Sequence, residues 1–259
     1  MRVALISIAL LTGCSAMTAK PPAAAVSDLA PSGTLRAAIN VGNAVLAARP
    51  SAPGAEPTGI SVDLARELGR RLGVPVQLVV FDAAGKAGGW DIAFVALDPA
   101  RAAEISQSPP YVQIEGAYLV RNDSPLKKND EVDRKGHRVV VGRNSAYDLY
   151  LTRALKNAEI VRTPTSATVV DTMLKENYEV SAGVKQALEN DARRVPGVRL
   201  LPGRFMVINQ AMASQKGKEA GARYLREFVE EMKASGFVAK AIERHKQPSA
   251  VVAPPGDPQ

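Results

Sequence analysis

Short apolar runs alternate with amphipathic stripes in the first half of the chain. The runs at 76–81 and 92–97 are almost wholly apolar, which is typical of parallel strands covered on both faces. A first strand is predicted at 34–41. Leucines within 64–72 recur at the spacing of one helix face, and Ser61 is positioned to cap that helix. The pattern predicts a strand, a helix and two further strands.

The same order returns in the second half. A run at 138–142 predicts a strand, Ser145 begins a helix with one apolar face, and 180–184 predicts another short strand. A long amphipathic helix follows at about 218–234. Because helices separate the strands through short connections, the fold class is expected to be α/β, with parallel sheets.

The first residues have the pattern of an export signal. Met1 and Arg2 precede a short apolar stretch, and Leu-Thr-Gly-Cys ends at Cys14. This stretch is too short to span a bilayer, and Leu-Thr-Gly-Cys resembles the lipobox of bacterial lipoproteins. We expect 1–13 to be a lipoprotein signal peptide and Cys14 to be lipidated; the alternative is a plain signal cut later, after Ala16.

Both ends of the remaining chain look irregular. Residues 14–32 are rich in Pro and Ala without periodicity and are predicted to be a tether, and 247–259 a disordered tail. Between them we find no internal repeat.

Composition narrows the function classes. The 259 residues carry a formal charge of +7, but basic and acidic residues are interleaved and no basic run alternates with aromatics. No nucleic-acid partner is therefore expected. His137 and His245 belong to no spaced ligand cluster and are expected to be solvent-exposed. Neither a Gly-x-Ser-x-Gly elbow nor a phosphate loop occurs, so we expect no metal and no cofactor.

Several short motifs occur in an order that resembles a known family. They are Gly33-Thr-Leu-Arg-Ala-Ala-Ile39, Gly59-Ile-Ser-Val-Asp-Leu-Ala-Arg-Glu-Leu68, Trp90-Asp-Ile92, Asp98-Pro-Ala-Arg101, Pro110-Tyr111, Asn144-Ser145 and Ser235-Gly-Phe237. Together they resemble the bacterial extracytoplasmic solute-binding proteins of family 3, which serve polar amino-acid ABC importers. The resemblance extends from about residue 33 to residue 244.

The resemblance implies a type II periplasmic-binding-protein fold. Two α/β lobes would hold the ligand in the cleft between them, with 33–120 and 206–246 forming lobe 1 and 121–205 forming lobe 2. The chain would cross between the lobes near 118–122 and 204–209.

The family also implies ligand-binding residues. Its Thr-Pro-x-Arg segment grips the ligand's α-carboxylate, and here Asp98-Pro-Ala-Arg101 matches at Arg101 but not at the threonine. A guanidinium matches a carboxylate with two parallel hydrogen bonds; the alternative is a surface arginine paired with Glu104. Asn144 and Ser145 match the second-lobe segment that meets the same carboxylate, although Ser145 also suits a simple helix cap.

Three departures affect the ligand. The family's ammonium-binding aspartate aligns with Lys185, which would repel an ammonium group and favour a second acidic or carbonyl group. Asn43 stands in the region where a stacking aromatic is expected. The stretch 82–89 is too short for the helix that normally precedes the Asp-Ile strand.

These observations predict a monomeric solute-binding lipoprotein on the periplasmic side of the envelope. It would deliver a small anionic metabolite, an organic acid or else an amino acid, with the organic acid favoured, to an ABC permease, with its lipid anchor in the membrane. The alternatives are an enzyme on the same scaffold, similar to a cyclohexadienyl dehydratase with Glu115 as general acid or base, or a ligand-sensing module.

Overall fold

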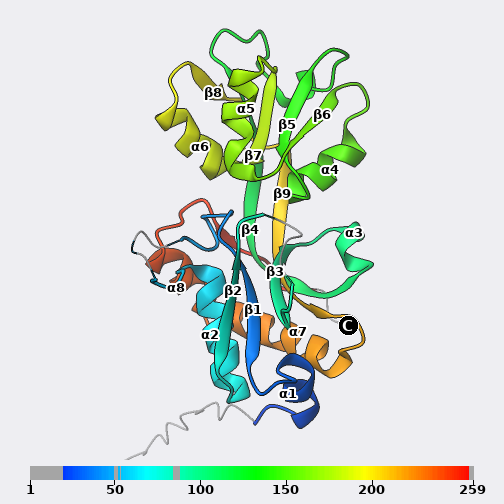
Figure 1. Ribbon diagram of the computed structural model, residues 1–259, viewed down its shortest axis with the longest axis vertical. Coiled ribbons are helices and arrows are strands. Elements are labelled where there is room, and N and C mark those ends of the chain that lie inside the picture. Colours follow the sequence, from blue (N-terminus) through cyan, green and yellow to red (C-terminus); the bar gives the residue numbers. More distant parts are fainter. Residues whose placement is uncertain (1–19, 50–51, 53, 84–87, 257–259) are drawn as a thin grey trace, which may run out of the picture.

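The computed structural model describes residues 20–49, 52, 54–83 and 88–256. It has two α/β lobes joined by two long strands (Figure 1). These strands, β4 (Ile105–Arg121) and β9 (Met206–Gln215), pair antiparallel along most of their length and pass from one lobe into the other. They link all strands of the described residues into one sheet of order β2-β1-β3-β9-β4-β7-β5-β6. The predicted two-lobed α/β architecture is confirmed.

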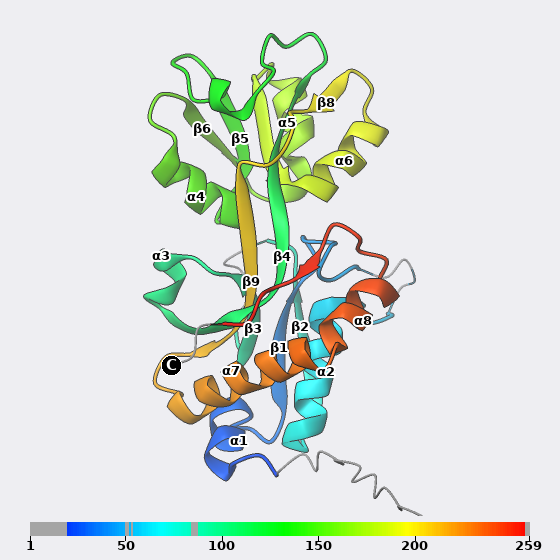
Figure 2. The same cartoon turned by 180° about the vertical axis from the view of Figure 1, so that it is seen from behind.

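Lobe 1, the lower lobe in Figure 1, is built from both halves of the chain. Figure 2 shows helices lying across one face of its sheet, where they bury the main apolar core. Its remaining elements are α1 (Ala23–Leu29), β1 (Leu35–Asn40), α2 (Ile60–Leu72), β2 (Val76–Phe81), β3 (Ile92–Ala96), α3 (Pro99–Ala102), α7 (Glu219–Ala234), α8 (Phe237–Arg244) and β10 (Val251–Val252).

Lobe 2 repeats the arrangement around three parallel strands of the same sheet. Strand β5 lies between β7 and β6, and both pairings are parallel. The elements are η1 (Asn129–Glu131), β5 (Arg138–Gly142), α4 (Ala146–Ala154), β6 (Glu159–Thr163), η2 (Ser166–Thr168), α5 (Val169–Lys175), β7 (Val180–Val184), α6 (Lys185–Arg194) and β8 (Val198–Leu200). The strands predicted at 76–81, 138–142 and 180–184 are therefore confirmed.

Both predicted irregular ends contain ordered elements that pack on lobe 1. Within the predicted tether, α1 buries Leu29 completely, and the Asp28 carboxylate accepts a hydrogen bond from the backbone N–H of Gly221 at 3.0 Å. Within the predicted tail, β10 pairs antiparallel with β4. Helix α1 has only seven residues and β10 only two, too few to give a periodic signal, so tertiary contacts decide their structure.

Two further sequence-based boundaries differ from the structure. Strand β4 already pairs with β7 of lobe 2 from Gly116, so its crossing comes before the predicted 118–122. The strand is continuous there, so no break in the strand marks the passage. Helix α2 begins at Ile60 without a side-chain cap, because the Ser61 hydroxyl instead lies 3.1 Å from the buried Tyr111 hydroxyl.

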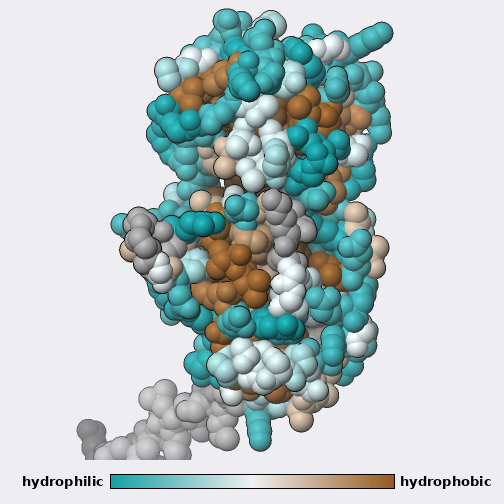
Figure 3. Space-filling view, viewed as in Figure 1, coloured by the Kyte–Doolittle hydropathy of each residue, from teal (hydrophilic) through white to brown (hydrophobic). Residues whose placement is uncertain are grey.

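The face of lobe 1 seen in Figure 1 carries little helical cover. The described residues between β2 and β3 form no helix, as the short 82–89 stretch predicts. Figure 3 shows an apolar area where β1 and β2 reach this face, and Val80 at the edge of the sheet is 44% exposed. None of the helices within the described ranges combines the length and apolar content that a membrane span requires.

Candidate functional site

Arg101 lies between the two lobes, on the short helix α3 that follows β3. Asp98 caps α3 by accepting a hydrogen bond from the backbone N–H of Ala100 at 2.9 Å, and Pro99 opens the helix. The Arg101 guanidinium donates to the carbonyl of Ala96 in lobe 1 at 3.0 Å and to the carbonyl of Asn144 in lobe 2 at 2.7 Å. The predicted pair with Glu104 is not formed.

The charge of Arg101 has no direct counterion. Within the described residues no carboxylate hydrogen-bonds to its guanidinium, and both of its acceptors are neutral carbonyls. Burial lowers the pKa of Arg101, while the charge of Asp98 acts in the opposite direction. A partly buried guanidinium without a carboxylate partner is a favourable place for an anion.

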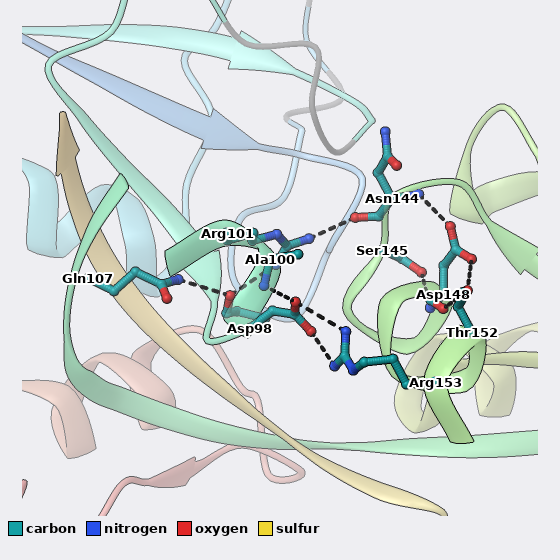
Figure 4. Close-up of polar contacts among 10 residues, drawn as sticks. Asp98, Ala100, Arg101, Gln107, Asn144, Ser145, Asp148, Thr152 and Arg153 are labelled. Atoms are coloured by element: carbon teal, nitrogen blue, oxygen red, sulfur yellow. Dashed lines mark hydrogen bonds and ion pairs between the residues drawn. The ribbon is translucent and has the colours of Figure 1, made fainter. Parts of the chain in front are cut away.

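The turn between β5 and α4 provides the lobe 2 side. Asn144 adopts a left-handed backbone conformation, with φ of 59°, which directs its carbonyl toward Arg101 (Figure 4). Ser145 caps α4 by accepting from the N–H of Asp148 at 3.0 Å, and the Asp148 carboxylate accepts from the N–H of Asn144 at 2.8 Å. The structure thus brings Arg101 and Asn144 together, with Ser145 beside them as a helix cap.

A second contact between α3 and α4 was not foreseen from the sequence. Asp98 and Arg153 form an ion pair with distances of 2.6 and 3.3 Å between guanidinium nitrogens and carboxylate oxygens. The Asp98 side chain is 4% exposed, whereas Arg153 is half-exposed. The one feature of the sequence that could have indicated this ion pair is Asp98 itself, which stands where the family has threonine.

Lys185 begins α6, which lies on the other side of the β4 and β9 strands from α3 (Figure 1). It follows β7, which runs parallel to β5, so Lys185 and Asn144 leave neighbouring strands at the same sheet edge. The Lys185 ammonium, however, donates to the Glu115 carboxylate at 2.8 Å, and Arg204 donates to the other oxygen of that carboxylate at 2.7 Å. No described contact joins Lys185 to Arg101.

A pocket of about 230 Å³ adjoins Lys185. It lies between β4, the beginning of α6 and the chain segment ahead of β10, where the Ser249 hydroxyl donates to the Gln186 side chain at 2.5 Å. Glu189 also lines it and forms no described hydrogen bond or ion pair. Its lining residues are Ile114, Glu115, Val184, Lys185, Gln186, Glu189 and Ser249.

The remaining predicted site residues lie elsewhere. Asn43 stands in the turn after β1, where its carbonyl accepts from the N–H groups of Leu46 and Ala47, and no described hydrogen bond links it to Arg101 or Lys185. Cys14 lies outside the described residues.

The expectation that both histidines are solvent-exposed is wrong. His137 is half-buried and lies 3.0 Å from the Val132 carbonyl; His245 is mostly buried and lies 2.9 Å from the Asp63 carboxylate. Within the described part of the chain, no three His, Cys, Asp or Glu side chains come together as a metal site requires.

Glu115 has the wrong protonation behaviour for a general acid at neutral pH. Hydrogen bonds and charge from Lys185 and Arg204 lower the pKa of its carboxyl group, which keeps it ionised. Both of its oxygens are also occupied by cations. The geometry therefore makes Glu115 the counterion of Lys185 and Arg204.

Solved structures share this architecture at low sequence identity. AbpA from Streptococcus pneumoniae bound to L-arginine matches with 18% identity, a TM-score of 0.70, and 85% of this chain and 98% of that chain covered. The solute receptor for L-cysteine of Neisseria gonorrhoeae matches with 18% identity, a TM-score of 0.73, and coverages of 86% and 94%. The ancestral amino-acid-binding protein AncCDT-1, a precursor of cyclohexadienyl dehydratase, matches with 19% identity, a TM-score of 0.68, and coverages of 85% and 98%.

The sequence comparison identifies the family directly. The search of curated proteins found no match to the chain. Residues 39–248 match the bacterial extracellular solute-binding proteins, family 3, and this range includes Arg101, Asn144, Ser145 and Lys185. With its type II periplasmic-binding-protein fold and an arginine that contacts both lobes, the chain belongs to family 3 of the bacterial extracellular solute-binding proteins.

Proposed function

We propose that this protein captures a small carboxylate-bearing solute outside the cytoplasm and delivers it, as a monomer, to an ABC importer. The observation that carries the proposal is Arg101, a partly buried cation at the lobe interface without a carboxylate partner in the described residues. A solute carboxylate would supply the missing charge through two parallel hydrogen bonds. Family membership supports the extracytoplasmic location.

Lobe closure is the proposed mechanism of capture. Arg101 already touches the backbone of lobe 2 at Asn144, so a carboxylate held there contacts groups from both lobes only when the lobes are close. A ligand with such differential contacts shifts the equilibrium toward the closed state. Binding then presents a distinct closed surface to the importer, and no covalent step is needed.

The finer solute class depends on Lys185. We propose that a cation at the position of the family's ammonium-binding aspartate favours carboxylates without a free ammonium group, dicarboxylates and oxo acids among them. Solved structures with this fold were obtained with or named for L-arginine and L-cysteine. Glu115 neutralises part of the Lys185 charge, which makes the expected discrimination moderate.

A thermal-shift screen tests the proposed function. The chain from Lys20 onward would be heated with amino acids, oxo acids, dicarboxylates and amines. A solute present at 100 times its dissociation constant should stabilise the protein by about 2.7 kcal/mol. Stabilisation by amines alone would contradict the proposal.

Binding without chemistry is the second part of the proposal. It is supported by Glu115, the candidate acid, which is held ionised by two cations. Incubation with prephenate and analysis of the products tests it. Dehydrated product formed by the wild type but not by Glu115→Gln would establish the enzymatic alternative.

The lipid anchor forms the third part. We propose diacylation at Cys14 because Leu-Thr-Gly-Cys ends a short apolar signal. Metabolic labelling with a palmitate analogue should mark the wild type and not Cys14→Ser, and Cys14→Ser should be lost from the membrane fraction. Absence of label on the wild type would contradict the anchor.

A further inference from the structure

Two arginines lie around one buried carboxylate at the contact between α3 and α4. Figure 4 shows Arg153 extending from α4 to Asp98, while Arg101, on the short helix that Asp98 caps, points to Asn144. Asp98 uses one oxygen for the Ala100 N–H and both oxygens for Arg153. Among the described residues, the acceptors of the Arg101 guanidinium are both backbone carbonyls.

Asp98 and Arg101 occupy positions from which their side chains can meet. Asp98 is the N-cap of α3 and Arg101 is three residues later, the spacing at which cap and helix side chains commonly interact. The charge of Asp98 already acts on Arg101, since it opposes the effect of burial on the Arg101 pKa. Without Arg153, the buried Asp98 carboxylate would have Arg101 as a cation three residues away on the helix that it caps.

We propose that Arg153 is a positioning residue of the solute site: by binding Asp98 across the lobe interface, it keeps Arg101 available for the solute's carboxylate. This inference rests on the proposed function, since it assigns Arg101 to a carboxylate. Arg153 itself does not touch the solute. Because Arg153 belongs to lobe 2, it can bind Asp98 only when the lobes are close. Closure therefore prevents the Asp98 carboxylate from competing with the solute's carboxylate for Arg101. The threonine of the family pattern would require no such partner, which explains why an aspartate at 98 is paired with an arginine on α4.

Substitution of both partners separates this role from a simple latch. If the ion pair only held the lobes together, Arg153→Ala, Asp98→Asn and the double variant would all weaken binding alike. If Arg153 keeps Arg101 available, Arg153→Ala weakens binding, whereas Asp98→Asn and the double variant bind nearly as the wild type does. Asparagine is also a favourable N-cap, so α3 should keep its start.

Titration calorimetry with L-arginine, L-cysteine, L-glutamate, 2-oxoglutarate and succinate provides the first measurement. For the probe that binds the wild type most tightly, we expect Arg153→Ala to weaken binding roughly tenfold and Asp98→Asn in that background to restore most of it, the non-additivity expected of contacting residues. Arg134→Ala, which removes an exposed lobe 2 charge without a described side-chain partner, is the matched control. Equal loss in all three variants would overturn the proposal.

A second measurement needs no solute. The guanidinium ¹⁵N–¹H signals of Arg101, assigned by their loss in Arg101→Lys, report whether it is paired with Asp98. We expect these signals to differ between Arg153→Ala and the Arg153→Ala/Asp98→Asn double variant, because only the first retains the carboxylate. Identical signals would overturn the role of Arg153 whatever the probes show. If no probe binds the wild type while the signals do differ, the proposed function fails for these solutes and the competition between the two arginines stands.

Discussion

The basic side chains on the two sides of the interlobe space differ in their hydrogen-bond partners. On the Lys185 side, Lys185 and Arg204 share the Glu115 carboxylate, and both of its oxygens are within 2.8 Å of a cation. On the Arg101 side, the Asp98 carboxylate is bound by Arg153, and within the described residues the Arg101 guanidinium donates to two backbone carbonyls.

The difference shows which cation is available to a ligand. A cation that already has a carboxylate gains little from a second one, because the first must be displaced or must repel it. A desolvated guanidinium with neutral partners gains the full interaction. The position of a basic residue in a family pattern therefore does not by itself identify the residue that binds the solute's carboxylate. Whether that basic residue already has a carboxylate partner in the protein must also be known.

The largest expected effect is at Arg101. Arg101→Ala should weaken solute binding by roughly 2–5 kcal/mol, the range for removing one partner of a buried charge pair. Folding should persist, because the side chain serves the interface and contributes little to the core. Calorimetry measures the affinity, and thermal unfolding provides the control. Unchanged affinity would mean that Arg101 does not bind the solute's carboxylate.

Lys185 should have a smaller effect on preference. Lys185→Asp removes the cation and places a carboxylate at the β7 edge, so it should shift the balance between an amino acid and its oxo acid toward the amino acid by roughly tenfold, about 1.4 kcal/mol. Competitive binding of matched pairs measures this, with Lys185→Gln as the neutral control. Tighter binding of the amino acid by the wild type would contradict the proposed solute class and leave the role of Arg101 standing.

Glu115 should have the smallest effect, on stability. Lys185 and Arg204 lower the pKa of the Glu115 carboxyl in the folded protein. Its contribution is therefore fully present above the ordinary glutamate pKa of about 4.3 and is lost as the pH falls through the lowered value. Since the pair is partly exposed, Glu115→Gln should lower the free energy of unfolding by about 1 kcal/mol or less at neutral pH. Denaturant unfolding at pH 7 and at pH 3 should show that the difference in free energy of unfolding between the wild type and Glu115→Gln becomes smaller in acid. A larger difference in acid would mean that the ion pairs of Glu115 do not stabilise the fold.

The sequence by itself determined the regular parts of this protein. Apolar runs gave the strands at 76–81, 138–142 and 180–184, because buried parallel strands are apolar on both faces. The order of short motifs led to the family and to Arg101, since a guanidinium after a capped helix start is a local feature that needs no distant partner to recognise.

Only the tertiary structure decided which charges are paired and which short segments are ordered. Lys185 lies 70 positions from Glu115, and Arg153 lies 55 positions from Asp98, so neither pair leaves a local signal in the chain. Helix α1 and strand β10 are too short to be stable alone and form because α7 and β4 offer surfaces for them. Periodicity reports which face of a segment is buried, whereas its partner depends on chain folding that brings distant residues together. In the described part of this protein, that folding pairs Asp98 with Arg153 and leaves the Arg101 guanidinium with two carbonyl acceptors.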